Sequence, residues 1–119
     1  MHVAERPLVS IVTPTLNQRR FIESALRSVS NQTYPRIEHV VVDGGSSDGT
    51  IDLLRRAESP SFQSISEPDR GMYEAINKGL RLANGEIVAY LNSDDAYLPW
   101  AVEAMVHAFE GRPDRKSVV

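Results

Sequence analysis

Apolar and polar positions along this chain form blocks that favour a strand and then a helix, four times in succession. Each predicted strand is rich in β-branched and apolar residues, and each predicted helix has apolar positions three and four residues apart. The predicted strands cover residues 8–13, 37–42, 62–65 and 86–91. The predicted helices cover residues 18–33, 50–57, 70–83 and 99–110. This alternation predicts an α/β domain with a mainly parallel sheet, flanking helices and right-handed crossovers.

Individual residues set the expected element ends. Pro14 cannot donate to a sheet ladder, so the first strand is expected to stop there. Asn17 and Asp69 are expected to be helix N-caps, and Asn84-Gly85 is expected to end the third helix. Met72, Met105 and Trp100 occupy helical positions and are expected in the core, and residues 116–119 resemble the opening of a fifth strand.

Composition excludes several classes of protein. The chain has 119 residues, 41% hydrophobic and 24% charged, a globular balance for one domain. A net charge of −3 and a pI near 5.6 give no basic field for nucleic acid. There are no cysteines, which excludes disulfides, thiolate zinc sites and cysteine nucleophiles. The longest apolar runs are far shorter than the ~20 residues of a membrane span, so we expect no transmembrane segment and a cytoplasmic location, or a peripheral one at the inner face of the membrane.

Carboxylates gather where the predicted strands end. Asp43 follows the second strand, Asp69 the third, and Asp94-Asp95 the fourth. Ligands of open α/β sheets bind outside the carboxyl ends of the strands, so these acidic residues are expected along one edge. Clustered carboxylates need a cation, and their oxygen atoms suit Mg²⁺ or Mn²⁺ together with substrate phosphates. The sequence therefore predicts a divalent metal and a phosphorylated ligand.

Each feature taken alone has a simpler interpretation. Taken alone, Asp94-Asp95 is explained by capping of the last helix, and residues 43–49 are explained by a turn. An EF-hand is excluded because its glycine would be one place late and its twelfth position is Leu54. Neither G-x-G-x-x-G nor G-K-[ST] is present, and His39 lies within a strand, where a structural role is expected. A phosphoacceptor receiver domain is disfavoured, because such a domain places its acidic pair after strand one, where this chain has Thr13-Pro14-Thr15.

Taken together, four segments resemble the inverting family 2 glycosyltransferases with the GT-A fold, from Leu8 to about Glu110. The segments are VSIVTPTLN (9–17), HVVVDGGSSDGT (39–50), EPDRGMYEAINKG (67–79) with ANGEI (83–87), and LNSDD (91–95) with Pro99. The last segment stands in the place of the metal-binding D-x-D motif.

The resemblance implies roles for particular residues. Thr13, Pro14 and Thr15 would line the nucleotide pocket, and Asp43 would accept a hydrogen bond from the base. Asp69 and Arg70 would form the pocket wall near the base and the diphosphate. Ser93 and Asp94 would contact the nucleotide sugar, and Asp94 and Asp95 would hold Mn²⁺ or Mg²⁺. The donor would be a nucleotide-diphosphate sugar and the acceptor a glycan or a lipid-linked molecule, in polysaccharide or cell-envelope glycan synthesis.

Two departures from the family pattern change the expectation. Asn92 replaces the first aspartate of D-x-D, so this position brings no charge to the metal. The general base of an inverting transfer is expected beyond Val119, and Glu103 and Glu110 are expected to be surface residues. Residues 1–119 would then be a single, incomplete nucleotide-sugar-binding domain with an exposed sheet edge, prone to self-association or of marginal stability. The alternative is a non-catalytic nucleotide-sugar-binding remnant.

Overall fold

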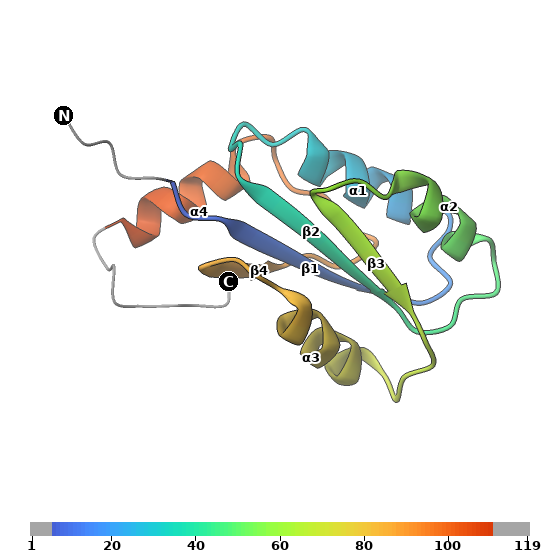
Figure 1. Cartoon of the computed structure of the whole chain (residues 1–119). Helices are drawn as coiled ribbons and strands as arrows, with labels where there is room; N and C mark the ends of the chain where they lie inside the picture. Colours follow the sequence, from blue (N-terminus) through green and yellow to red (C-terminus); the bar gives the residue numbers. More distant parts are fainter. Residues whose placement is uncertain (1–5, 111–119) are drawn as a thin grey trace.

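A parallel sheet between two helical layers forms the centre of the computed structural model, which describes residues 6–110 (Figure 1). The strands are β1 (Val9–Thr15), β2 (Ile37–Asp43), β3 (Phe62–Ser66) and β4 (Ile87–Tyr90). The helices are α1 (Ile22–Ser30), α2 (Thr50–Ala57), α3 (Met72–Leu82) and α4 (Ala101–Phe109). All three strand pairings are parallel, so the predicted α/β fold is confirmed.

The strand order is β3-β2-β1-β4, and it reverses direction beside β1. The chain moves outward from β1 through β2 to β3, and then returns through α3 to place β4 on the other side of β1. Such a reversal opens a crevice at the carboxyl ends of the two diverging strands. The topology therefore places a binding crevice between the ends of β1 and β4.

The two faces of the sheet carry different helices, as Figure 1 shows. On one face, α1 packs with α4 against β1 and β4, and with α2 against β2. On the other face, Ala75 of α3 packs against Val40 and Val42. Val41 between them joins the α1–α2 cluster, because successive side chains of a strand point to opposite faces. The run of valines in β2 is thus buried on both sides, as expected for a central parallel strand.

Helix α3 lies unusually close to β1. A Cβ atom added at Gly79 would lie 2.3 Å from Cγ1 of Val12. Since real Cβ atoms do not approach other heavy atoms so closely, glycine at this position sets the distance between the helix and the sheet.

The carboxylate of Glu38 fastens the loop between α3 and β4 to the amino end of the sheet. Ser10 Oγ donates to Glu38 Oε1 at 2.6 Å, and the Asn84 backbone N–H donates to the same oxygen at 2.5 Å. Gly85 N–H donates to Ser10 Oγ at 2.8 Å. Burial alone would raise the pKa of Glu38, but the hydrogen bonds from Asn84 and Ser10 lower it overall. The Asn84-Gly85 stop predicted for the third helix is therefore confirmed, with α3 ending at Leu82.

The predicted end of the first strand is wrong. Strand β1 continues through Pro14 to Thr15, and Pro14 pairs with Val42 in register. Alternate residues of a parallel strand bond to opposite neighbours, and Thr15 O accepts from Gly44 N–H on the β2 side. The nitrogen of Pro14 therefore faces the β4 side, where the ladder has already ended at Val12 and Tyr90. The missing N–H costs the sheet no hydrogen bond.

Both predicted N-caps are wrong. Helix α1 begins at Ile22 with Phe21 at the N-cap, and α3 begins at Met72 with Gly71 at the N-cap. Asn17 instead adopts a left-handed conformation with φ 53°, and its side chain bonds to a neighbouring loop. Asp69 instead accepts a hydrogen bond from the Gly71 N–H at 3.0 Å.

Two of the three predicted core residues are exposed. Met72 is 53% and Trp100 56% exposed, because Met72 is the first residue of α3 and Trp100 is the N-cap residue that precedes α4. Met105 packs against the core as predicted. Residues 116–119, the predicted fifth strand, lie outside the described residues.

Candidate functional site

A cavity of about 320 Å³ lies at the crevice between the carboxyl ends of β1 and β4. The first turn of α3 closes its remaining side, with Gly71 and Met72 in the lining. Five of the residues predicted from the sequence line it: Pro14, Thr15, Asp69, Ser93 and Asp94. The other lining residues are Leu16, Gln18, Gly71, Met72, Ala75 and Asn92. The fold therefore joins three chain segments, predicted separately, in one site.

Thr15 lines this site and has a buried hydroxyl without a hydrogen-bond partner. The residue is 6% exposed, and its Oγ1 is the buried side-chain oxygen that has no hydrogen-bond partner within residues 6–110. A buried hydroxyl without a partner lowers the stability of a fold by ~1–3 kcal/mol, so such groups are normally hydrogen-bonded in folded proteins. At the wall of a cavity, such a group indicates a polar ligand.

Thr13 lies on the same strand but does not line the cavity. Its hydroxyl is 2.8 Å from Nε2 of His39 on β2, and both residues are buried. Burial lowers the pKa of His39 to about 3, so the imidazole is neutral. The structural role expected for His39 is therefore confirmed.

Asp43 is fully buried and organises the loop after β2. Its Oδ2 accepts from the N–H groups of Gly45 and Ser46 at 2.9 and 2.8 Å, and from Ser66 Oγ at 2.8 Å. Its Oδ1 accepts from Ser46 Oγ at 2.5 Å. The carboxylate thus ties the end of β2 to the end of β3 and does not line the cavity. The predicted contact between Asp43 and a nucleobase stays a prediction.

The loops that follow β1 and β2 are bound to each other. Asn17 N–H donates to Ser46 Oγ at 2.8 Å, and Asn17 Oδ1 accepts from Ser47 N–H at 2.8 Å. Arg19 N–H donates to Asp48 Oδ2 at 2.9 Å. These bonds hold the segment that follows Thr15 in a fixed conformation, which also fixes that wall of the cavity.

Asp69, which lines the cavity, has its carboxylate next to Gly44. A Cβ atom added at Gly44 would lie 2.9 Å from Asp69 Oδ2, so glycine at this position makes room for the carboxylate. Lys78 of α3 binds the segment just before Asp69, with Nζ 3.0 Å from Glu67 Oε1 and 3.4 Å from the Pro68 carbonyl oxygen. Arg70 is exposed and is not among the lining residues.

The end of β4 presents an amide and two carboxylates. Asn92 and Asp94 line the cavity, whereas Asp95 is exposed beside it and donates its N–H to the Asn92 carbonyl at 3.1 Å. The Tyr90 hydroxyl donates to Asn92 Oδ1. Burial, followed by the charges of Asp95 and Asp94, raises the pKa of the Tyr90 phenol.

Sequence reasoning missed the contribution of α3. Met72 was expected in the core because its position fits a helical stripe, yet its sulfur lies 3.4 Å from the Tyr90 hydroxyl at the rim of the cavity. Gly71, with φ 125°, adopts a conformation that favours glycine and could have indicated a tight turn into α3.

Within the described residues, no helix is long and apolar enough to cross a membrane.

Comparison with known proteins gives one consistent family. The sequence pattern of "Glycosyl transferase family 2" matches residues 10–115. Over 108 residues the chain is 37% identical to the uncharacterized glycosyltransferase Rv1514c of Mycobacterium tuberculosis, covering 89% of this chain and 41% of that protein.

Two solved structures share the fold. TarS 1–349 of S. aureus in complex with UDP-GlcNAc has a TM-score of 0.81 and 25% identity, over 87% of this chain and 31% of that one. The mannosyltransferase PcManGT of Pyrobaculum calidifontis in complex with GDP-Man and Mn²⁺ has a TM-score of 0.76 and 35% identity, over 87% and 32%. The chain thus spans less than half the length of each protein that it matches here.

Proposed function

Because this chain belongs to glycosyl transferase family 2, we propose that the cavity between β1 and β4 binds a nucleotide-diphosphate sugar. The sugar would pass, with inversion, to a hydroxyl of a glycan or lipid-linked acceptor in polysaccharide or cell-envelope glycan synthesis. The unpaired Thr15 hydroxyl is the observation that carries this proposal, because a hydroxyl-, phosphate- or carbonyl-bearing ligand would complete its hydrogen bonding.

The two solved relatives support the class of donor but not its base. TarS was solved with UDP-GlcNAc, and PcManGT with GDP-Man. A uracil and a guanine nucleotide are therefore both compatible with this fold. We propose a nucleoside diphosphate sugar as the donor class and leave the base to the binding experiment below.

The lining residues divide by chemistry. Thr15 and Ser93 are buried hydroxyls suited to the polar atoms of the nucleotide. Asp69 would accept from N–H or O–H groups, and the exposed Arg70, next to Asp69 in the chain, would reach a diphosphate. Asp43 would act indirectly, by shaping the loop that holds Asn17 and therefore the end of β1.

The acidic residues fit a divalent metal only together with the ligand. Asp94 and Asp69 both line the cavity, with Asp95 beside it, but no group of three or more histidine, aspartate or glutamate residues among residues 6–110 could hold an ion alone. Mg²⁺ typically takes one or two carboxylates and completes its shell with phosphates and water. We propose that Asp94, aided by Asp95, holds Mn²⁺ or Mg²⁺ against the diphosphate. When bound, the ion would stabilise the charge of the departing nucleoside diphosphate.

No general base is proposed among the described residues. Glu103 on α4 and Glu110, directly after α4, are exposed as expected, and neither lines the cavity. Glu103 accepts from Thr33 Oγ1 at 2.7 Å, at the far end of α1.

Isothermal titration calorimetry with UDP-GlcNAc and with GDP-mannose, each with and without Mn²⁺, tests the proposal. We expect binding of one donor that strengthens with Mn²⁺, and loss of that strengthening in Asp94→Asn. Asp52→Asn is the matched control, because Asp52 is exposed on α2 and lies away from the cavity. A folded sample that binds neither donor would refute the proposal.

The alternative, a non-catalytic nucleotide-sugar-binding remnant, predicts the same binding without transfer. Incubation with radiolabelled donor and a lipid-linked acceptor distinguishes the two, since transfer of label by the chain would refute the alternative.

A further inference from the structure

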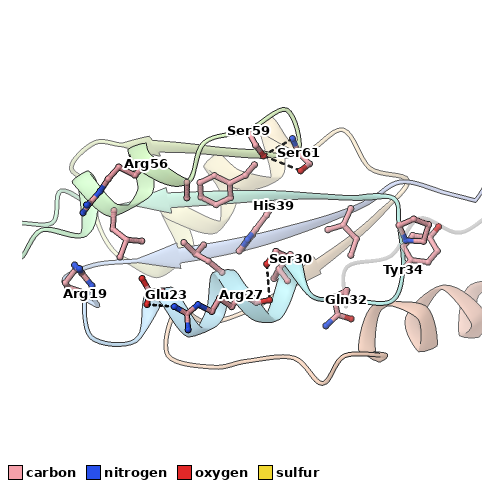
Figure 2. Close-up of a pocket in the computed structure, with 17 residues that line it drawn as sticks. Arg19, Glu23, Arg27, Ser30, Gln32, Tyr34, His39, Arg56, Ser59 and Ser61 are labelled. Carbon is pink, nitrogen blue, oxygen red and sulfur yellow. Dashed lines mark hydrogen bonds and ion pairs between the residues drawn. The ribbon is translucent and has the colours of Figure 1, made fainter.

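We refer to the cavity between the ends of β1 and β4 as the donor cavity. A second pocket, of about 690 Å³, lies on the opposite side of β1, between α1 and the α2–β3 connection (Figure 2). We call it the α1–α2 pocket. It shares no lining residue with the donor cavity. Its volume lies in the range of ligand sites, which is roughly 300–1,000 Å³.

Apolar side chains make up much of the α1–α2 pocket, and the charged Glu23 and Arg27 in its lining are paired with each other. Leu26 and Val29 of α1 face Leu53 of α2, and Ile37 and Phe62 complete the apolar lining. Hydroxyl and amide groups form the rim: Ser30, Gln32, Ser59 and Ser61. His39 lies at the centre in Figure 2, and because burial lowers its pKa to about 3, it adds no charge.

Positive charge is concentrated at one end. Figure 2 shows Arg19 and Arg56 at the same end of the pocket, with Tyr34 and Gln32 at the other. Within the described part of the chain, no carboxylate lies within ion-pair distance of Arg19 or Arg56, whereas Arg27 is paired with Glu23 at 3.0 Å. The pocket thus combines two guanidinium groups that have no acidic partner with a largely apolar wall, and its Glu23–Arg27 pair adds no net charge.

This arrangement fits a ligand with one anionic head and one apolar body. Guanidinium groups suit phosphate, which accepts hydrogen bonds from both arms of the fork. A bound peptide would bring polar backbone groups along its whole length, and the apolar wall of Leu26, Leu53 and Phe62 offers them no partners. Residues 16–36 carry four arginines and one glutamate, although the whole chain has a net charge of −3, so the α1 side of this pocket is basic.

We infer that the α1–α2 pocket binds an anionic phospholipid, with the phosphate between Arg19 and Arg56 and the start of an acyl chain along Leu26, Leu53 and Phe62. The chain would then be held at a membrane surface by its α1–α2 face, while the donor cavity at the strand ends remains open. This inference is independent of the proposed function, because it concerns a separate site.

The test is calorimetric titration of the whole chain with monomeric dihexanoyl phosphatidylglycerol and, in parallel, with glycerol 1-phosphate, which lacks the acyl chains. We expect the lipid to bind at least about tenfold more tightly than glycerol 1-phosphate, because only the lipid has acyl chains that contact the apolar residues of the pocket. Equal affinity for the two would overturn the inference.

A pair of double variants separates the pocket from the general charge of this face. Arg19→Glu with Arg56→Glu should weaken lipid binding by about thirtyfold or more, since two charge-assisted contacts are lost. Arg20→Glu with Arg55→Glu changes the charge equally at the neighbouring exposed positions, which do not line the pocket, and should change binding by less than about threefold. Equal losses in both would overturn the inference.

Two further measurements complete the design. Co-sedimentation with phosphatidylcholine vesicles, with and without phosphatidylglycerol, should show retention only with the anionic lipid and only when Arg19 and Arg56 are present. Lack of retention would overturn the membrane role. Donor binding measured on the single variant Arg56→Glu should be unchanged, because Arg56 lies on α2 and does not line the donor cavity, so failure of the lipid site and failure of the donor site are distinguishable.

Discussion

Two threonines on β1 illustrate how one strand serves both structure and function at the scale of single residues. Thr13 bonds to His39 and is satisfied within the fold, whereas Thr15, two residues later, has a buried hydroxyl without a partner. Both are buried, so their difference lies in hydrogen bonding and not in exposure. They form a matched pair for mutation.

Thr15→Val should weaken donor binding without harming the fold. Valine keeps the shape and removes an unpaired hydroxyl, so the free energy of unfolding should stay the same or rise by up to about 1 kcal/mol. Donor affinity should fall about fivefold, the value of one neutral hydrogen bond. Thermal unfolding and calorimetry measure the two effects. A loss of stability with unchanged donor affinity would contradict the role given to Thr15.

Thr13→Val should show the reverse pattern. It leaves Nε2 of the buried His39 without its partner, and the free energy of unfolding should fall by about 1–2 kcal/mol. Donor affinity, measured in the same titration, should stay within about twofold of the wild type. A large loss of donor affinity would show that Thr13 contacts the nucleotide after all.

His39 should make the fold sensitive to mild acid. In the unfolded chain its pKa is near the ordinary 6.5, whereas in the folded chain it is about 3. Below pH 6.5 the unfolded state therefore binds the extra proton, and the free energy of unfolding falls by up to about 1.4 kcal/mol per pH unit. Glu38, whose pKa is lowered, stabilises the fold above its unfolded pKa near 4.3, and this contribution is lost only at lower pH.

Urea unfolding at several pH values between 6.5 and 4.5 isolates the histidine. His39→Gln can still bond to Thr13 but does not titrate, so its stability should vary less with pH in this window than that of the wild type. Parallel curves for the two proteins would contradict the assignment.

At the scale of elements, the close approach of α3 to β1 depends on Gly79. The missing side chain lets the helix settle onto Val12, and this position of α3 brings Gly71 and Met72 to the donor cavity. The helix that closes the site is thus placed by a contact more than one turn away from it.

Gly79→Ala should destabilise the protein. Alanine gains about 1 kcal/mol in helix propensity, but its Cβ would lie 2.3 Å from Val12 Cγ1 in a closely packed layer. Overpacking costs of ~1–3 kcal/mol, increased here by so short a contact, should lower the free energy of unfolding by about 2 kcal/mol. Chemical denaturation measures it.

Val12→Ala provides the control for this contact. Combined with Gly79→Ala it removes the clashing methyl groups, so the double variant should be more stable than the sum of the two single changes predicts. If the stability changes of the two single variants simply add, the contact between residue 79 and Val12 is not what destabilises Gly79→Ala.

The pattern of strands and helices could be predicted because apolar spacing reports burial directly, and burial decides these elements. The helix starts could not. Asn17 has the chemistry of an N-cap, but its oxygen bonds to Ser47 in another loop, a partner that no local pattern encodes. Asp69 bonds to Gly71 two residues later, in a local turn that ends before α3 begins. The position of Thr15 and Asp94 at one cavity could be predicted from the parallel fold, whereas the contribution of α3 required the packing at Gly79.

At the scale of the whole molecule, the sheet has two outer strands. In the described residues β3 pairs only with β2, and β4 only with β1, which leaves one edge of each without a strand partner. Open edges pair with other chains unless a charge or a bulge prevents it. Self-association therefore stays a prediction for this chain.

Single lysines placed on the two outer strands test it. Val88→Lys on β4 should shift the chain toward monomer in sedimentation equilibrium if association uses the β4 edge, and Gln63→Lys should do so if it uses the β3 edge. A monodisperse wild-type monomer, or an oligomer that neither lysine disturbs, would rule out edge pairing.

The exposed position of Trp100 makes it a natural optical probe. It is the single tryptophan of the chain, is 56% exposed, and follows Pro99, whose carbonyl accepts from Thr33 N–H at 2.8 Å beyond the end of α1. Since its indole already meets water in the folded state, unfolding should change its fluorescence little and is better followed by circular dichroism. Any molecule or further segment that covers this loop should shift the emission to the blue and protect it from acrylamide quenching. One native residue thus gives a label-free signal for whatever docks beside α4.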